Sequence, residues 1–177
     1  TRERSLNRAD GRYMGWERKR GAIHSLFELL KSGEEADLKA YPACDETLRG
    51  TKLFIALDSD TRLSAGAARA FAGAMLHPLN RPKVRIETGT VTEGFGILQP
   101  RVTTDPEAAG RTAFSRIFAG RGGSDPYASA VSDLYHDLFS RGTFSGKGII
   151  DIDAYLTCLS GRLPENAVLS HDLLEGG

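Results

Sequence analysis

The chain has 177 residues, of which 40% are hydrophobic and 26% are charged, a balance typical of an ordinary globular segment. Lys and Arg together number 23, as do Asp and Glu, so no net field favours nucleic acid or an anionic membrane surface. The two cysteines, Cys44 and Cys158, form neither a metal-binding spacing nor a disulfide framework. No apolar run approaches the roughly 20 residues of a spanning helix.

The first half of the chain predicts helix, strand and helix in turn. Apolar residues at helical spacing predict a helix over 16–30, which Gly33 ends. The short apolar run 53–57 is typical of a buried parallel strand. Ser64 is expected to cap a second helix that stops before Pro78.

The second half continues the alternation. Two strand-like stretches lie between 85 and 102, broken at Gly94 and Gly96, and a glycine-bearing loop covers 142–148. Further helices are predicted from 105, over 127–139, over about 153–159 and from about 168. Alternating strands and helices predict an α/β fold, with a mixed, mostly parallel sheet flanked by helices. We expect residues 1–177 to form a single domain, incomplete at both ends because no Met opens the chain and an apolar helical pattern closes it.

The most informative motif is Asp58-Ser59-Asp60, directly after the run 53–57. In an extended chain, Asp58 and Asp60 project to the same side. Two carboxylates at the end of a strand suit a hard divalent cation such as Mg²⁺ or Mn²⁺, which often bridges to substrate phosphates. The alternative is that these acids only open a turn and cap the next helix.

Two classes of enzyme place Asp-x-Asp after a hydrophobic strand. One is a metal-dependent glycosyltransferase, in which the pair holds the metal on a nucleotide diphosphate. The other is a haloacid-dehalogenase-type phosphatase, in which Asp58 would be the nucleophile and Asp60 the general acid. Lys147 could supply the later lysine that this phosphatase needs, but its late acidic pair is missing, so the phosphatase is the weaker hypothesis.

Near the end of the chain, His171 and Asp172 begin an apolar helical pattern. An acid in a first helical turn is stabilised by the helix dipole in any protein, and it could also serve as a general base. The histidines His24, His77 and His136 share no metal spacing, and we expect surface or core positions for them.

Ordered blocks of sequence carry a family resemblance. They include Gly-Trp-Glu-Arg-Lys-Arg-Gly, Asp-Ser-Asp-Thr-Arg, Gln-Pro-Arg, Ser-Gly-Lys-Gly and Ser-His-Asp, and they lie at 15–21, 57–63, 77–82, 94–102, 125–127, 130–135, 144–149 and 164–176. In this order they resemble the glycosyltransferase domain of the cyclic β-1,2-glucan synthases, over nearly the whole chain. The chain departs from the family pattern at Ala22 and Phe27, where Lys and Asn are usual.

The resemblance implies a GT-A-type fold and an inverting transfer of glucose from UDP-glucose onto a growing β-1,2-glucan. It implies a divalent metal, Mg²⁺ or Mn²⁺, and a large polytopic protein of the bacterial inner membrane whose transferase part faces the cytoplasm. The remainder of that protein, the nucleotide sugar and the glucan acceptor would be the partners. A degenerate glucan-binding domain without catalysis is the alternative from another class.

The resemblance also implies roles for individual residues. Asp58 and Asp60 match the metal and diphosphate pair, Asp172 matches the general base, and Lys19 matches a donor-contacting lysine. The residues matching positions near the acceptor cleft are Gln99, Arg101, Lys147 and His171.

Overall fold

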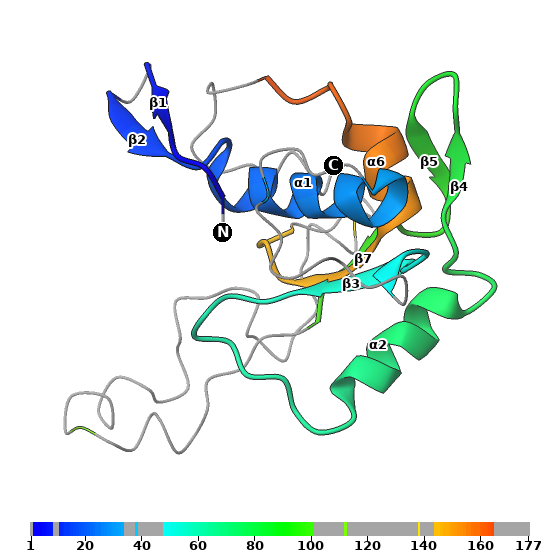
Figure 1. The fold of residues 1–177 in the computed structure, drawn as a ribbon. Coiled ribbons are helices and arrows are strands. Elements are labelled where there is room, and N and C mark those ends of the chain that lie inside the picture. The colour runs from blue at the N-terminus through cyan, green and yellow to red at the C-terminus, as the bar shows by residue number, and fades with distance from the viewer. Residues whose placement is uncertain are drawn as a thin grey trace.

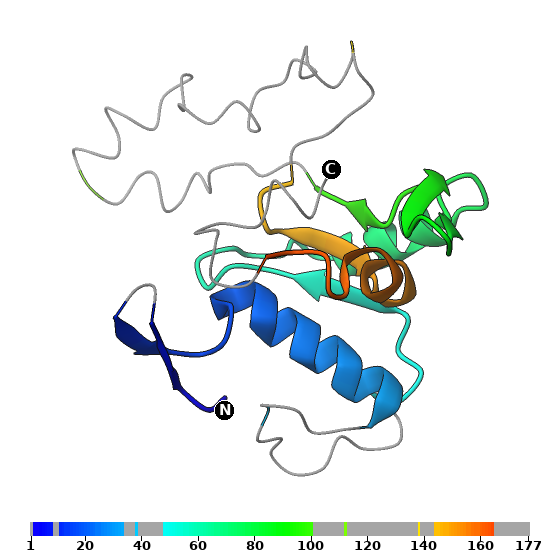
Figure 2. The same ribbon diagram turned by 90° about the horizontal axis from the view of Figure 1, so that it is seen from above.

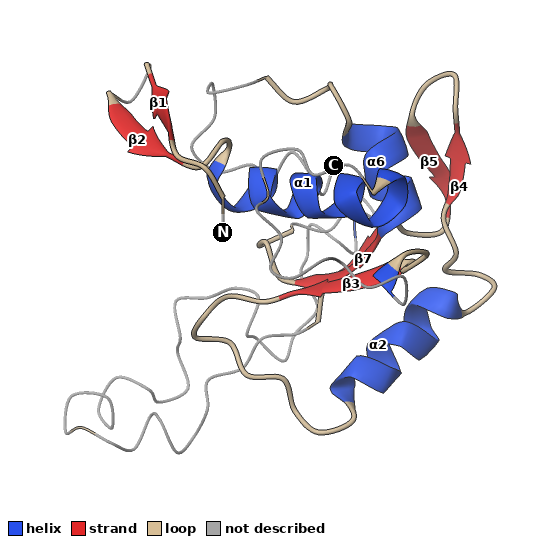
Figure 3. Ribbon diagram, in the orientation of Figure 1, coloured by secondary structure: helices blue, strands red, loops and turns tan. Residues whose placement is uncertain are grey.

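The computed structural model describes residues 2–8, 11–33, 48–100 and 144–164, together with Leu38, Thr112 and Leu138. The elements, labelled in Figure 1 where there is room and coloured by type in Figure 3, are β1 (Ser5–Asn7), β2 (Arg12–Met14), α1 (Arg18–Ser32), β3 (Leu53–Ala56), α2 (Ala67–Leu76), β4 (Lys83–Arg85), β5 (Thr90–Glu93), β6 (Ile97–Leu98), β7 (Gly148–Asp151) and α6 (Ile152–Leu159). The helices predicted from 105, over 127–139 and from 168 lie outside the described residues, apart from Leu138.

The central sheet has the strand order β3-β7-β6. β7 pairs antiparallel with both neighbours, with Ala56 opposite Gly148 and Leu98 opposite Ile149. The pairs β1–β2 and β4–β5 are antiparallel as well. The prediction of a mostly parallel sheet is therefore wrong for the described strands. It failed because β7, for which the sequence predicted no strand, inserts between β3 and β6 and separates the two strands that do run the same way.

The antiparallel insertion of β7 decides which strand ends lie next to one another. Since β3 and β6 both run against β7, their carboxyl ends lie at the same edge as the amino end of β7. The segment after Ala56, the segment after Leu98 and the turn before Gly148 consequently emerge together. This edge is where the polar residues of the predicted site lie.

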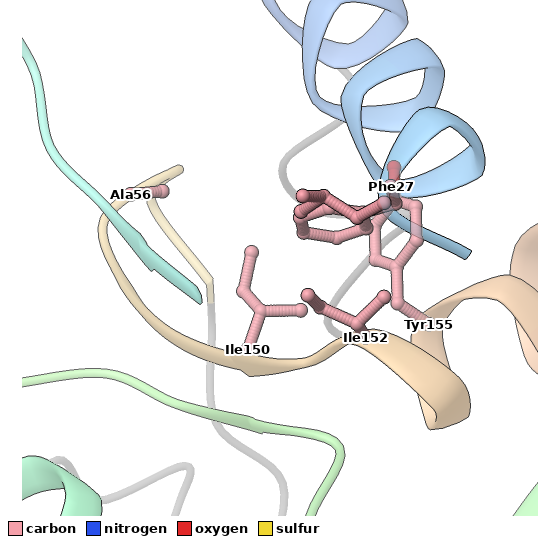
Figure 4. Close-up of a cluster of buried hydrophobic side chains, with 6 residues drawn as sticks. Phe27, Ala56, Ile150, Ile152 and Tyr155 are labelled. Atoms are coloured by element: carbon pink, nitrogen blue, oxygen red, sulfur yellow. The ribbon is translucent and has the colours of Figure 1, made fainter. Parts of the chain in front are cut away.

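A cluster of buried side chains joins α1, the sheet and α6 (Figure 4). Phe27 and Ile152 are fully buried, and Ile150 is 1% exposed. The Phe27 ring meets the rings of Phe54 and Tyr155 edge-on, with centroids 5.2 Å and 5.0 Å apart, a favourable aromatic geometry. The apolar spacing that predicted the first helix is the face that α1 buries here.

Helices lie on both sides of the sheet, with α1 and α6 on one side and α2 on the other (Figure 1). Seen from above, α1 lies alongside β3 (Figure 2), in keeping with the contact between Phe27 and Phe54. Successive residues of β7 face opposite sides, so the buried Ile149 points away from Ile150 and toward the α2 side.

The helix termini test two sequence predictions, for Gly33 and Ser64, and show one cap that was not predicted. Gly33 ends α1 in a left-handed conformation, and its N–H donates to the carbonyl of Leu29, as predicted. Asp151 caps α6 by accepting the Ala154 N–H at 2.9 Å. The prediction that Ser64 caps α2 is wrong, because the chain turns in a left-handed conformation at Gly66 and leaves Ser64 before the turn.

Two hairpins flank this core. β1–β2 stands off from the sheet at the start of α1 (Figure 2), and β4–β5 packs beside α6. The second hairpin is fastened by Arg162, which donates to the carbonyl of Gly89 at 2.9 Å. Within the described part of the chain, no helix combines the length and hydropathy that crossing a bilayer requires.

Candidate functional site

The edge where β3 and β6 end and β7 begins gathers three of the residues that the sequence singles out. Asp58 follows β3, Gln99 follows β6, and Lys147 immediately precedes β7. Lys19 reaches the same place from the first turn of α1. Residues far apart in sequence therefore share one polar site, and the antiparallel register of the sheet brings three of them there.

Asp58 is held between two ammonium groups. The Nζ atom of Lys19 lies 2.5 Å from Oδ1, and the Nζ atom of Lys147 lies 3.0 Å from Oδ2. The Lys19 ammonium also donates to the carbonyl oxygen of Gly146 at 2.7 Å. One carboxylate and one carbonyl thus tie α1, β3 and the turn before β7 together.

The two lysines change the acid strength of Asp58. The hydrogen bond from Lys19 has the largest effect; partial burial opposes it, and the hydrogen bond and charge of Lys147 act in the same direction as Lys19. The net result is that the pKa of Asp58 lies below its ordinary value of 3.8. Asp58 is therefore a carboxylate at neutral pH, and it acts as an acceptor of charge-assisted hydrogen bonds rather than as a proton donor.

The pair Asp58 and Asp60 offers a modest set of metal ligands. Among the described residues, no group of three or more His, Cys, Asp and Glu side chains is arranged to hold a metal ion. Mg²⁺, however, commonly binds through one or two carboxylates and completes its shell with water and substrate phosphates. The chain is not extended here: it turns at residues 59–60, and the Thr61 N–H donates to the carbonyl oxygen of Asp58 at 3.0 Å, so the expectation of two carboxylates on one side of an extended segment is wrong. Asp60 is exposed and Asp58 is anionic, and carboxylate oxygens of this kind fit a hard cation that arrives with a phosphate ligand.

The backbone at the start of α1 has a shape that directs Lys19 toward this edge. Glu17 and Arg18 both have positive φ angles, 49° and 51°, which non-glycine residues seldom adopt. Arg2 holds this turn, because its guanidinium donates to the carbonyl of Arg18 at 2.7 Å and also to that of Trp16. The start of α1 is therefore fixed by tertiary contacts rather than by a capping side chain.

A buried ion pair supports the same turn from inside. Glu17 is 5% exposed and Arg20 is 8% exposed, and their side chains approach to 3.3 Å. The Arg20 guanidinium also lies over the Trp16 ring, 5.3 Å from its centroid, in a cation–π contact. Gly21 fits tightly against the Trp16 carbonyl, where any Cβ atom would collide. The Trp-Glu-Arg-Lys-Arg-Gly block thus builds a rigid support for Lys19.

Gln99 contacts the protein chain itself. Its Oε1 atom accepts the backbone N–H of Ser145 at 2.6 Å and the Ser145 hydroxyl at 3.0 Å. These bonds fasten the turn over 144–147, which carries Lys147, to the end of β6. The predicted acceptor-cleft roles of Gln99 and Lys147 stay predictions. Gln99 holds the turn through Ser145, and Lys147 contacts Asp58.

Three predicted site residues, Arg101, His171 and Asp172, lie outside the described residues. Conversely, sequence reasoning missed the roles of Gly146 and Ser145, whose carbonyl and amide serve the site. The only available signal was the glycine-bearing loop itself. The Trp16 ring packs against Arg20 and, at 5.9 Å between ring centroids, against His24.

Comparison with known proteins tests the resemblance found in the sequence. No family model matches the chain. The chain is 45% identical, over 179 aligned positions, to a segment of the cyclic β-(1,2)-glucan synthase NdvB of Rhizobium meliloti (strain 1021). That match covers 99% of this chain and only 6% of the relative's length. The resemblance found in the ordered sequence blocks is therefore confirmed, and it concerns one small part of a much longer relative.

Proposed function

We propose that this chain, which matches a cyclic β-(1,2)-glucan synthase along 99% of its length, is a segment of that kind of enzyme and contributes its glucosyl-transfer site. The reaction is inverting transfer of glucose from UDP-glucose to the 2-hydroxyl of a growing β-1,2-glucan. In this proposal the fold is of GT-A type, and the segment faces the cytoplasm as part of a multi-pass protein of the bacterial inner membrane.

The observation that carries the proposal is the meeting of Lys19, Lys147 and Asp58 where β3 and β6 end and β7 begins. Two flexible ammonium groups on one polar edge form a natural binding place for the phosphates of a nucleotide sugar. Lys19 is 43% exposed and Lys147 is 22% exposed, so a ligand can reach both. The turn at Glu17 and Arg18, held by Arg2 and by the buried pair of Glu17 and Arg20, fixes the backbone of Lys19 and leaves its side chain to meet the ligand.

Asp58 and Asp60 are the residues that would hold Mg²⁺ or Mn²⁺. A bound cation of this kind supplies stabilisation of the negative charge that develops on a departing UDP. Lys19 and Lys147 also stabilise the negative charge on the departing UDP, and the backbone need not rearrange for them to do so.

The acceptor side of the reaction is assigned to residues beyond the described ranges. Asp172 is proposed as the general base that takes the proton of the acceptor 2-hydroxyl. The oxygen then forms a bond to the anomeric carbon, and the bond from that carbon to the UDP oxygen breaks with inversion. Arg101 and His171 are proposed to bind the acceptor glucan.

The test uses the protein expressed from its complete reading frame, in detergent. Asp58→Asn and Asp172→Asn should each lower glucose incorporation and UDP release by about 10²–10⁴-fold. Glu93→Gln is the matched control, because Glu93 is an exposed carboxylate that also contacts a lysine, Lys83, at 2.5 Å. Full UDP release in both site variants would contradict the proposal.

The phosphatase is the second candidate, because Lys147 lies 3.0 Å from Asp58, as a phosphoryl-stabilising lysine would. It predicts hydrolysis of a generic phosphoester that Asp58→Asn abolishes and UDP-glucose does not affect. The sequence identity to a glucan synthase favours the transferase. A glucan-binding module without catalysis would bind glucan with no metal-dependent affinity for UDP.

A further inference from the structure

We infer that Lys19 and Lys147 are exchangeable counter-charges of Asp58. When the nucleotide sugar binds, both ammonium groups leave the Asp58 carboxylate and contact the phosphates. Binding of the divalent cation to Asp58 therefore depends on the nucleotide. This inference rests on the proposed function and adds to it an order of assembly. It also moves Lys147 to the donor side of the site, whereas the family resemblance placed it near the acceptor.

The first step of the argument is the division of contacts on Asp58. Each carboxylate oxygen contacts a different lysine, Oδ1 with Lys19 and Oδ2 with Lys147. A cation that binds Asp58 must therefore compete with an ammonium group at either oxygen. A divalent cation at Asp58 would be repelled by the positive charges of Lys19 and Lys147. The lysines therefore lower the affinity of this site for a cation that arrives without the nucleotide.

The second step is the balance of formal charge. Two lysines and one divalent cation carry four positive charges, whereas Asp58 and Asp60 carry two negative charges. A nucleoside diphosphate sugar contributes the two negative charges that are missing. Cation and nucleotide together make a neutral assembly, and either one alone leaves a net charge in the site.

The third step is that the ammonium groups can move while their backbones stay. Lys19 lies on the first turn of α1, whose backbone is fixed by Arg2 and by the buried pair of Glu17 and Arg20. Lys147 lies on a turn fixed by the hydrogen bonds of Gln99 to Ser145. Both side chains are partly exposed, and lysine has a flexible four-carbon stem.

The experiment measures Mn²⁺ binding to the protein from its complete reading frame, by the electron paramagnetic resonance signal of free Mn²⁺, with and without saturating UDP. Asp58→Asn identifies the part of the signal that belongs to this site. In the wild type, UDP should tighten Mn²⁺ binding by at least about tenfold. In Lys147→Met, Mn²⁺ should bind at least about threefold more tightly without UDP, and the effect of UDP should fall below about threefold.

Two control variants test whether Lys147 exchanges partners or only holds the structure through its contact with Asp58. Lys83→Met removes a lysine that contacts Glu93 at 2.5 Å away from the site, and it should leave Mn²⁺ binding unchanged. Lys147→Arg keeps the positive charge and should keep most of the coupling. The thermal unfolding of each variant identifies those that fail to fold, and if Lys147→Met is one, Lys19→Met is measured in its place.

The outcomes distinguish this inference from the proposed function. Unchanged Mn²⁺ affinity in Lys147→Met or Lys19→Met, with normal UDP binding, overturns the counter-charge inference and leaves the transferase intact. Mn²⁺ binding in the wild type that is indifferent to UDP does the same. A wild-type protein that binds no UDP at any Mn²⁺ concentration contradicts the proposed function itself.

Discussion

The two ends of β7 serve different purposes within four residues. At the amino end, the Gly146 carbonyl accepts from Lys19 and the Lys147 ammonium contacts Asp58. The Lys147 and Asp58 side chains are partly exposed. At the carboxyl end, Ile150 and Ile152 are 1% and 0% exposed and pack with Phe27 and Tyr155 (Figure 4). One end is polar and adjustable, whereas the other is apolar and fixed.

The difference explains how a small sheet can carry an adjustable site. Apolar burial supplies most of the stability, and it is concentrated where α1 and α6 cover the sheet. The charged contacts at the opposite end are partly exposed, and such pairs contribute little to folding. They can therefore exchange partners without unfolding the strand that carries them, and substitutions at the two ends should separate stability from function.

The largest expected effect on stability is at the carboxyl end of β7. Ile150→Ala removes a buried side chain beside Phe27, and we expect it to lower the free energy of unfolding by about 2–4 kcal/mol. Ile86→Ala is the control, because Ile86 is 82% exposed on the β4–β5 hairpin and should change stability by less than about 0.5 kcal/mol. Urea unfolding measures both, and equal effects would contradict the location of the core.

The next effect is at the first residue of β7. A Cβ atom on Gly148 would lie 2.5 Å from the carbonyl oxygen of Leu98, so Gly148→Ala must push β6 away. We expect a loss of about 1–3 kcal/mol in the free energy of unfolding, together with weaker UDP binding because Gln99 and Lys147 move apart.

Gly73→Ala provides the contrast within the same protein. Gly73 lies inside α2 with open space where the Cβ atom would be, so alanine should stabilise the helix by about 0.5–1 kcal/mol. Opposite signs for the two glycine substitutions, measured by urea unfolding, are the expected result. A neutral Gly148→Ala would mean that β6 and β7 are not tightly paired at this point.

A smaller effect is expected where β7 passes into α6. Asp151 accepts the Ala154 N–H at the start of that helix, and Asp151→Ala should cost about 1 kcal/mol of stability. Asp151→Asn keeps a capping oxygen and should restore most of the loss. UDP binding should remain at the wild-type level in both variants, because Asp151 belongs to the packing end of the strand. Urea unfolding and UDP titration are the two measurements.

Local patterns in the sequence predicted most single elements correctly. Periodic apolar residues gave the helix that became α1, with Gly33 at its end, and the segment that became α6. The run over 53–57 gave β3. These features depend on neighbours in the chain, and local propensity carries that information.

Pairing between distant strands could not be predicted in the same way. β7 has only four residues and begins with Gly148, where the predicted loop ended, so no strand was predicted there and the antiparallel order β3-β7-β6 was missed with it. For the site, Asp58 was found from its motif and Lys19 from family resemblance. The contact of Lys147 with Asp58 depends on the register of Ala56 against Gly148, which no local pattern reveals.

The smallest effect concerns acid at the polar end of the sheet. The pKa of Asp58 in the folded chain lies below its ordinary value of 3.8, chiefly because of Lys19. A lowered pKa means that the ion pairs stabilise the fold above pH 3.8, and that this contribution is lost as pH falls through the folded pKa. Because both lysines and Asp58 are partly exposed, the contribution should stay below about 1 kcal/mol and shrink in high salt. Urea unfolding of the wild type and of Asp58→Asn should therefore give curves that differ at pH 6 and converge toward the acid end. If the difference in free energy of unfolding between the two proteins stays constant with pH, the lysines do not interact electrostatically with the Asp58 carboxylate. The counter-charge inference would then lose its electrostatic basis.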